Sequence, residues 1–132
     1  MNKGNHPHAT SGVVLSVITP VYNEEKNIPI LYEKLTSALS SLGREYEIIA
    51  VDDGSRDGSR EALKEVAKKD HKVKLIFLRN NFGQTAALAA GIEEAKGEYI
   101  VLIDSDLENS PEDIGRLVAK LEEGYQVVSG WR

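Results

Sequence analysis

Short apolar runs of strand length alternate with segments of helical spacing along nearly the whole chain. The runs lie at residues 13–19, 46–51, 73–78, 99–103 and 125–129. This alternation is typical of a parallel sheet whose strands are joined by crossover helices. We therefore predict an α/β fold that is Rossmann-like, with three α/β/α layers and a mostly parallel sheet.

Helices are predicted between these runs. Apolar residues follow helical spacing from Ile28 to Leu42, and Pro29 lies near the start of that segment. The segment 83–95 is alanine-rich and apolar on most of its surface, so we expect it to be well buried. Gly91 costs this helix about 1 kcal/mol relative to alanine, and close packing against a strand would explain its presence. The other two predicted helices lie at residues 59–67 and 110–124.

The composition favours a single domain and argues against several classes of function. The chain has 132 residues, 41% of them hydrophobic, and its formal net charge of −5 argues against a nucleic-acid partner. Without cysteine, it has neither disulfides nor zinc–thiolate sites. No apolar run approaches the roughly 20 residues that span a bilayer, and residues 1–12 lack the apolar segment of a signal peptide. We expect a disordered tail over 1–12, one domain over 13–132 and a cytoplasmic location.

The most specific chemical signal is the segment Ile100–Glu108. Four apolar residues run directly into Asp104, Asp106 follows after one residue, and Glu108 ends the series. In an extended backbone these three side chains point the same way, at the sheet edge where open α/β sheets bind ligands. Carboxylates that converge repel one another unless a cation lies between them. We therefore predict that Asp104, Asp106 and Glu108 bind Mg²⁺ or Mn²⁺ carrying phosphates.

Polar loops also follow three other predicted strands, and all four loops meet at one edge of a parallel sheet. Taken alone, each loop has two interpretations. Asp53 is a turn residue or an acceptor for a nucleotide base, and Tyr22 is a core aromatic or a stacking surface. Glu24 stabilises the next helix or binds a ligand, and Arg79 is solvated or clamps a phosphate. Phe82 is expected in the core. The three loops are Pro20-Val21-Tyr22-Asn23-Glu24-Glu25, Asp52-Asp53-Gly54-Ser55 and Arg79-Asn80-Asn81-Phe82-Gly83-Gln84.

In order and spacing, these motifs resemble those of family 2 glycosyltransferases, which have the GT-A fold. The resemblance covers about residues 14–132 and rests on three segments: 16–24, 51–55 and 104–106. Within the family the chain is most similar to the polyprenyl-phosphate branch, which includes dolichyl-phosphate and undecaprenyl-phosphate sugar transferases. The segments that indicate this branch are 79–87, 104–112 and 128–132.

The resemblance implies a substrate site with two parts. Pro20, Val21, Tyr22, Glu24 and Asp53 would hold the nucleoside, and Asp104, Ser105 and Asp106 would face the ribose, diphosphate and metal. Arg79, Gln84 and Arg132 complete the implied substrate-binding set, and Arg132 matches an arginine that contacts phosphate in this branch. The branch commonly has glutamine at the position of Glu108 and a His-Pro pair at that of Asn109-Ser110. Glu108 stays a candidate ligand because a carboxylate binds a divalent ion more tightly.

The implied function is the metal-dependent, inverting transfer of a sugar from a nucleotide-diphosphate sugar to an acceptor, with a polyprenyl phosphate favoured. Asp104 and Asp106 would be the catalytic residues, through the cation that neutralises the departing diphosphate. A lipid phosphate is already ionised and needs no general base, and no base is evident in this chain. We expect the acceptor site and any membrane-associated segment to follow Arg132.

Three alternative functions stay open. A family 2 enzyme that adds sugar to a glycan hydroxyl in capsule or lipopolysaccharide synthesis would need a base beyond residue 132. A non-catalytic nucleotide-sugar-binding module would share the donor motifs. A phosphoacceptor receiver domain also has an acidic pair at a strand end, with another aspartate about fifty residues on, as from Asp53 to Asp104. Receivers, however, begin with the acidic strand, whereas here a complete strand–helix unit comes first.

Overall fold

A parallel sheet forms the centre of the structure, a computed structural model that describes residues 12–104, 113, 116, 119–120 and 128–129. Within this part of the chain the sheet has five strands in the order β3-β2-β1-β4-β5, and every pairing is parallel. The elements are β1 (Leu15–Val21), α2 (Ile28–Ser40), β2 (Tyr46–Asp52), α3 (Ser59–Lys69), β3 (Val73–Phe77), α4 (Gln84–Glu94), β4 (Tyr99–Leu102) and β5 (Val128–Ser129). The predicted α/β fold with a parallel sheet is confirmed.

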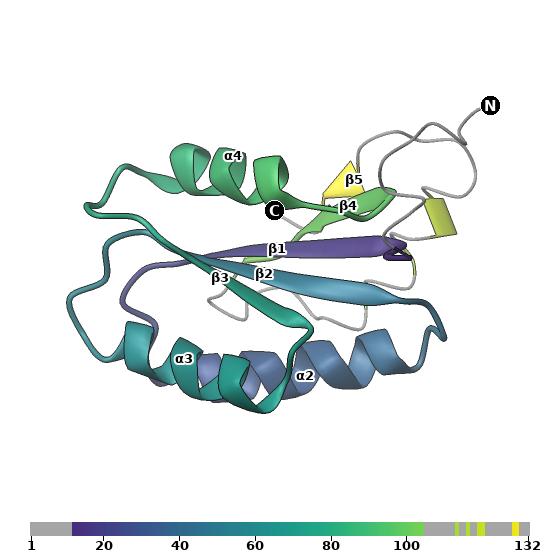
Figure 1. The fold of residues 1–132 in the computed structure, drawn as a ribbon, viewed down its shortest axis with the longest axis horizontal. Helices are drawn as coiled ribbons and strands as arrows, with labels where there is room; N and C mark the ends of the chain where they lie inside the picture. The colour runs from purple at the N-terminus through teal and green to yellow at the C-terminus, as the bar shows by residue number, and fades with distance from the viewer. Residues whose placement is uncertain (1–11, 105–112, 114–115, 117–118, 121–127, 130–132) are drawn as a thin grey trace.

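Helices cover both faces of this sheet. Figure 1 shows α2 and α3 on one face and α4 on the other. Successive side chains of a strand point to opposite faces, so Val17 joins the core under α2 and α3, while Ile18 joins the core under α4. Both side chains are fully buried. The predicted three-layer arrangement is therefore confirmed.

Strand β1 runs further than the sequence predicts, because it continues through Pro20 to Val21. Proline usually ends a central strand, since it cannot donate to the ladder. On β1 the carbonyl of Ile18 accepts from Ile103 N on the β4 side, and that of Val21 accepts from Asp53 N on the other side. By the period of two, Pro20 faces the β4 side, beyond the last paired residue Ile18. Its missing N–H therefore interrupts no ladder bond.

Helix α4 is less buried than predicted. Only Ala87 and Gly91 of α4 are buried, and Ile92 is 45% exposed. Of the helices whose bounds the structure describes, α2 and α3 lie on the other face of the sheet and give α4 no neighbouring helix, so only one stripe of its surface meets a partner. The mostly apolar surface of this segment predicted a well-buried helix, but a helix is buried on every side only where other elements pack against each of its faces.

Two predicted elements fall largely outside the described residues. One is the helix predicted at 110–124. The other is the strand predicted at 125–129, of which only Val128–Ser129 is described, as β5. Across the residues that are described, no helix combines the length and apolarity that crossing a bilayer requires.

Gly91 brings α4 close to the sheet. A Cβ atom at this position would lie 2.6 Å from Cγ2 of Ile18 and 3.3 Å from Cγ2 of Val51, and both of those side chains are fully buried. The predicted reason for this glycine, close packing against a strand, is therefore confirmed.

We expect Gly91→Ala to destabilise the protein, although alanine is the better helix former. Helix propensity favours the variant by about 1 kcal/mol, but inserting a methyl group into a packed core costs roughly 1–3 kcal/mol. The net loss should be about 1 kcal/mol in urea unfolding. Ala89→Gly, at an exposed position of α4, isolates the propensity effect. A Gly91→Ala variant more stable than the wild type would contradict the close packing.

A side-chain hydrogen bond joins α2 to the turn before β3. The hydroxyl of Tyr32 donates to Oδ2 of Asp70 at 2.6 Å. Burial, this hydrogen bond and the charge of Asp70 raise the pKa of Tyr32 to about 12. Desolvation acts to raise the pKa of Asp70, but hydrogen bonds from Tyr32 and from the backbone N–H of Lys72, with nearby positive charge, lower it overall.

Tyr32→Phe should destabilise the protein in a pH-dependent way. The pKa of Asp70 is lowered in the folded state. The stabilisation that this carboxylate contributes is therefore present at pH values above its ordinary pKa of 3.8, and it is lost as the pH falls through the pKa of the folded state. The pKa of Tyr32 is raised from 10.0 to about 12. The stabilisation that its hydroxyl contributes is therefore present at pH values below 10.0, and it is lost as the pH rises towards about 12. Urea unfolding should show a loss of about 1 kcal/mol at neutral pH that shrinks at both extremes. A loss independent of pH would contradict this account.

Candidate functional site

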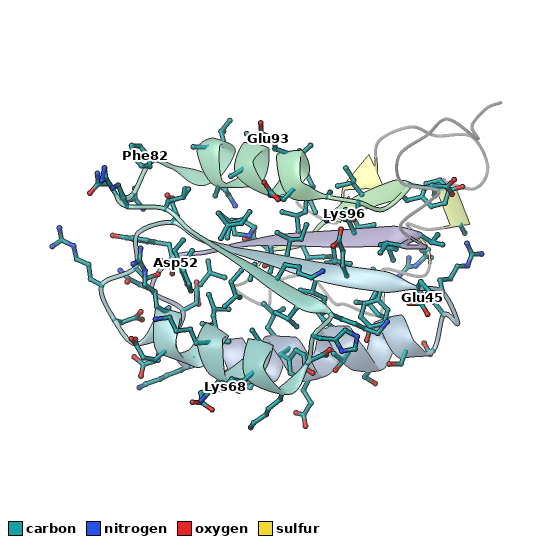
Figure 2. All side chains as sticks on the ribbon, in the orientation of Figure 1. Glu45, Asp52, Lys68, Phe82, Glu93 and Lys96 are labelled. Carbon is teal, nitrogen blue, oxygen red and sulfur yellow. The ribbon has the colours of Figure 1, made fainter. Side chains whose placement is uncertain are left out.

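A cleft of about 390 Å³ opens at the carboxyl edge of the sheet. It is formed by the loops that follow β1, β2 and β3 and by the chain that leaves β4. In the strand order β3-β2-β1-β4-β5, the chain adds β2 and β3 on one side of β1 and then β4 and β5 on the other, so the strand order reverses between β1 and β4. Open α/β sheets bind ligands at such a reversal of strand order. Figure 2 shows Asp52 and Phe82 near this end of the sheet, with Glu45 towards the opposite end. The lining residues are Pro20, Val21, Tyr22, Glu24, Asp53, Asn81, Gly83, Gln84 and Asp104.

The structure thus brings together seven residues that the sequence placed in the substrate site. They are Pro20, Val21, Tyr22, Glu24, Asp53, Gln84 and Asp104. Arg79, the eighth candidate within the described residues, is exposed and does not line the cleft. The remaining candidates, Ser105, Asp106, Glu108 and Arg132, lie outside the described residues.

Two aromatic residues near the cleft are exposed. Tyr22 lines the cleft and is 43% exposed, which rules out its interpretation as a core aromatic. Phe82 is 60% exposed, so its expected place in the core is wrong. Phe82 belongs to the loop before α4, and its backbone N–H is held by Asp53, which leaves the ring outside the packed layers.

Asp53 ties the loop before α4 to the end of β2. Its side chain is buried, and its carboxylate accepts hydrogen bonds from Phe82 N at 2.8 Å, Gly83 N at 3.0 Å and Asn81 Nδ2 at 3.3 Å. This negative charge also stabilises the positive end of α4. A carboxylate has about four lone-pair positions, so a ligand in the cleft can donate one more hydrogen bond. The sequence suggested a ligand acceptor at Asp53 but gave no sign of this structural role.

Gly54 allows the loops after β2 and β3 to touch. Its φ is +77°, a left-handed conformation that L side chains rarely adopt, and a Cβ atom there would lie 2.5 Å from the carbonyl carbon of Asn80. The two loops are therefore in backbone contact. This contact positions Asn81, which lines the cleft and which sequence reasoning treated only as part of a turn.

Hydrogen bonds also join the loop after β1 to the loop after β2, through side chains whose partners are about thirty residues away. The bonds run from Asn23 N to Ser55 Oγ at 2.8 Å, from Glu24 N to Ser59 Oγ at 2.9 Å, from Arg56 N to Asn23 Oδ1 at 2.8 Å and from Gly58 N to Glu25 Oε1 at 3.0 Å. These four hydrogen bonds fix the loop that carries Tyr22 and Glu24, in which Asn23 has a positive φ of 52°.

Asp57 takes part in the same loop contact. Desolvation acts to raise the pKa of Asp57, but hydrogen bonds from Ser59 and from the backbone of Glu25 lower it overall. The carboxylate is therefore held in its ionised form, in which it accepts both bonds.

The charge of the cleft has one sign. Its described lining includes the carboxylates of Glu24, Asp53 and Asp104 and no lysine, arginine or histidine. Asp104 is half-buried and directly follows the buried Ile103. Across the described residues no three acidic or histidine side chains form a metal-binding cluster. Hard carboxylate oxygens are nevertheless the donors that suit Mg²⁺ or Mn²⁺, and such a cation would offset the repulsion between these carboxylates and an anionic ligand.

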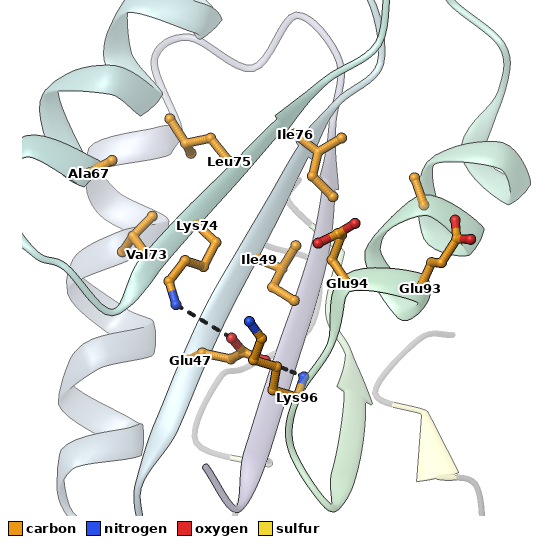
Figure 3. A pocket seen from close by; sticks show the side chains of 11 residues that line it. Glu47, Ile49, Ala67, Val73, Lys74, Leu75, Ile76, Glu93, Glu94 and Lys96 are labelled. Carbon is orange, nitrogen blue, oxygen red and sulfur yellow. Dashed lines mark hydrogen bonds and ion pairs between the residues drawn. The ribbon is translucent and has the colours of Figure 1, made fainter. Parts of the chain in front are cut away.

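A larger hollow, of about 580 Å³, lies beside β3 and α4 at the amino ends of the strands. Figure 3 shows Glu47 pointing towards Lys74 in this hollow. Glu47 is buried and accepts from Ser16 Oγ at 2.6 Å and from Lys96 N at 2.7 Å, and Lys74 Nζ lies 3.7 Å from its other oxygen. Because internal partners surround this carboxylate, we assign it to the fold and not to ligand binding.

Comparisons with known proteins agree with this architecture. The glycosyl transferase family 2 domain matches residues 16–132, and the chain belongs to that family. The family resemblance read from the motifs is thereby confirmed, and the receiver-domain alternative is excluded.

One curated relative is the undecaprenyl-phosphate 4-deoxy-4-formamido-L-arabinose transferase of Pseudomonas paraeruginosa. It is 46% identical over 120 residues, which are 90% of this chain and 35% of that protein. The chain therefore spans about a third of this relative's length.

Solved structures of two other proteins are similar and support the predicted GT-A fold. One is S. aureus TarS 1-349 in complex with UDP-GlcNAc, with 28% identity and a TM-score of 0.67 over 84% of this chain and 32% of that one. The other is the mannosyltransferase PcManGT from Pyrobaculum calidifontis in complex with GDP-Man and Mn²⁺. It has 29% identity and a TM-score of 0.59 over 70% of this chain and 27% of that one.

Asp53→Asn should loosen the loop before α4. The amide offers one acceptor oxygen in place of two and turns an NH₂ group towards a donor, so we expect a loss of about 1–3 kcal/mol of stability. Amide hydrogen exchange should show lost protection at Phe82 and Gly83. Asp57→Asn, at a neighbouring carboxylate that bonds the other loop, should leave these two amides protected. Unchanged protection in Asp53→Asn would contradict the capping role.

Proposed function

We propose that this chain is the donor-binding domain of an inverting glycosyltransferase that uses a nucleotide-diphosphate sugar and a divalent cation. The observation that carries the proposal is the position of the cleft in a family 2 domain. The cleft lies where the strand order reverses between β1 and β4, and Tyr22, Glu24, Asp53 and Asp104 line its wall. Solved relatives hold UDP-GlcNAc or GDP-Man, which supports a nucleotide sugar as the donor.

The residues of the cleft divide into two roles in this proposal. Tyr22 offers an exposed ring on which a nucleotide base can stack, and Asp53 has one acceptor position for a ring N–H of that base. Glu24 would join them in holding the nucleoside, and Asp104 would face the ribose and diphosphate. The loops that carry Tyr22, Glu24 and Asp53 are bonded to one another, so little rearrangement of them is required on binding.

A divalent cation fits the carboxylate-rich lining. Asp104, with Asp106 and Glu108, would hold it, and the Mn²⁺ in the complex of the Pyrobaculum mannosyltransferase supports this choice. When bound, the cation would neutralise the charge that develops on the departing diphosphate. Arg132 would add charge-assisted hydrogen bonds to the same phosphates, whereas Arg79 does not line the cleft.

We further propose that the acceptor is a polyprenyl phosphate at the cytoplasmic face of a membrane. The similarity to an undecaprenyl-phosphate transferase supports this acceptor. Its phosphate oxygen is ionised near neutral pH and can attack the anomeric carbon directly, with inversion and without a general base.

Binding of the donor can be tested on this chain by its effect on stability. A ligand that binds only the folded state stabilises it by about 2.7 kcal/mol at a concentration of 100 times its Kd. We expect a UDP-, GDP- or dTDP-sugar to raise the melting temperature, and the rise to depend on Mn²⁺ or Mg²⁺. The matching sugar without its nucleotide is the control. No shift with any of these donors, with either metal, would contradict the proposal.

The metal role is tested in the full-length protein. Asp106→Asn should reduce metal-dependent sugar transfer by at least about a hundredfold, since a carboxylate ligand at a catalytic cation is lost. Asp113→Asn is the matched control, because Asp113 pairs with the exposed Arg116 near the surface. Transfer by Asp106→Asn at the wild-type rate would refute the role of Asp106. Transfer to a glycan hydroxyl, with a polyprenyl phosphate inert, would refute the proposed acceptor.

A further inference from the structure

An ion pair between a fully buried aspartate and a partly exposed arginine lies behind the wall of the cleft. Asp52, the last residue of β2, is fully buried, and its Oδ2 accepts from Arg60 Nε at 2.9 Å and from Ser55 N at 3.0 Å. Its neighbour Asp53 lines the cleft, but neither Asp52 nor Arg60 does. The pair therefore acts on the cleft only through the chain that it holds.

Arg60 joins β2 to the chain that leaves β3. Its Nη2 donates to the carbonyl oxygen of Leu78 at 2.5 Å, while Leu78 N donates to the carbonyl oxygen of Asp52 at 2.9 Å. The guanidinium also lies 5.2 Å from the centre of the Phe77 ring. A planar fork with several fixed donors can reach a carboxylate and a carbonyl on two strands at once, which an ammonium group cannot do in the same geometry.

Leu78 is the point from which the loop before α4 departs. The loop, residues 79–83, places Asn81 and Gly83 in the cleft and presents the N–H groups of Phe82 and Gly83 to Asp53. Fixing the carbonyl of Leu78 fixes the direction in which this loop leaves the sheet. The backbone contact at Gly54 then passes any movement of the loop to the segment that follows Asp53.

Stability alone is a weak reason for this arrangement. Asp52 is fully buried while the Arg60 side chain is 34% exposed, so the aspartate bears most of the desolvation cost, which the attraction within such a pair often fails to recover. Oδ1 of Asp52 has no hydrogen-bond partner among the described residues, which adds to that cost. What the pair does supply is a fixed distance between the ends of two strands.

We propose that Arg60 is a positioning residue for donor binding: with Asp52 and Leu78 it sets the loop 79–83 against Asp53. This inference rests on the proposed function for its effect on the donor. Its effect on the loop is a property of the chain alone.

The test compares Arg60→Lys, which keeps the charge but loses the fork, with Lys64→Met. Lys64 is one helical turn further on, is exposed, and lies 5.6 Å from the same Phe77 ring. Hydrogen exchange in the free protein measures the protection of the Phe82 and Gly83 amides, urea unfolding measures global stability, and calorimetry measures the Kd of the nucleotide sugar that the wild type binds. We expect Arg60→Lys to lose at least tenfold in protection at both amides and at least tenfold in donor affinity. Lys64→Met should change neither.

A purely structural role would lower global stability and leave the affinity of the folded protein unchanged, and that result would overturn the inference. If Arg60→Lys does not fold, the double variant Asp52→Asn/Arg60→Gln, which removes both charges, takes the place of Arg60→Lys in the same measurements. A folded double variant with wild-type loop protection and affinity would also overturn the inference, and weakened loop protection and affinity would support it. If the wild type binds no nucleotide sugar, the proposed function fails, while the exchange data still decide whether Arg60 positions the loop.

Discussion

The structure depends on the parallel pairing of β1 with both of its neighbours. β1 pairs with β2 along its whole length, Leu15–Val21, but with β4 only as far as Ile18. The last three residues of β1 therefore extend past the β4 ladder. Because the strands are parallel, the loops after β1, β2 and β3 and the chain after β4 reach the same edge, and the reversal of strand order keeps helices from closing the space between them. The cleft follows from topology, and the residues at the strand ends determine its chemistry.

Buried polar groups serve different purposes at the two edges of the sheet. At the amino edge, Glu47 takes hydrogen bonds from Ser16 and from the backbone of Lys96, so its charge is used within the fold. At the carboxyl edge, Asp52 is held by Arg60, while Asp53 divides its acceptor positions between the loop before α4 and the cleft. Such a cleft is preorganised for a ligand, since loops that line it are already bonded to one another. Preorganisation lowers the entropy that binding must otherwise overcome.

The sequence predicted those features that depend on the chain's local pattern. Continuous apolar runs identify buried parallel strands, so the layers and the sheet edge could be foreseen. The seven residues of the cleft were predicted from the resemblance of the strand-end motifs to those of a known family. The sequence could not predict features set by a neighbour distant in the chain. The passage of β1 through Pro20 depends on where β4 stops pairing, and the exposure of Phe82 depends on Asp53 holding its backbone. Arg60 looks like one more surface charge on α3 until the carbonyl of Leu78 is seen beside it.

The contacts of Asp53 also support the proposed cation in this cleft. Open α/β sheets often meet a phosphate with the free N–H groups and positive end of a helix. Here the N–H groups of Phe82 and Gly83, which lead into α4, are already bonded to Asp53, and its negative charge offsets the positive end of that helix. The described lining adds Glu24 and Asp104 and no basic side chain. A diphosphate would therefore meet net negative charge in this part of the cleft. In the proposed function, a divalent cation held by the carboxylates that begin at Asp104 would offset that repulsion.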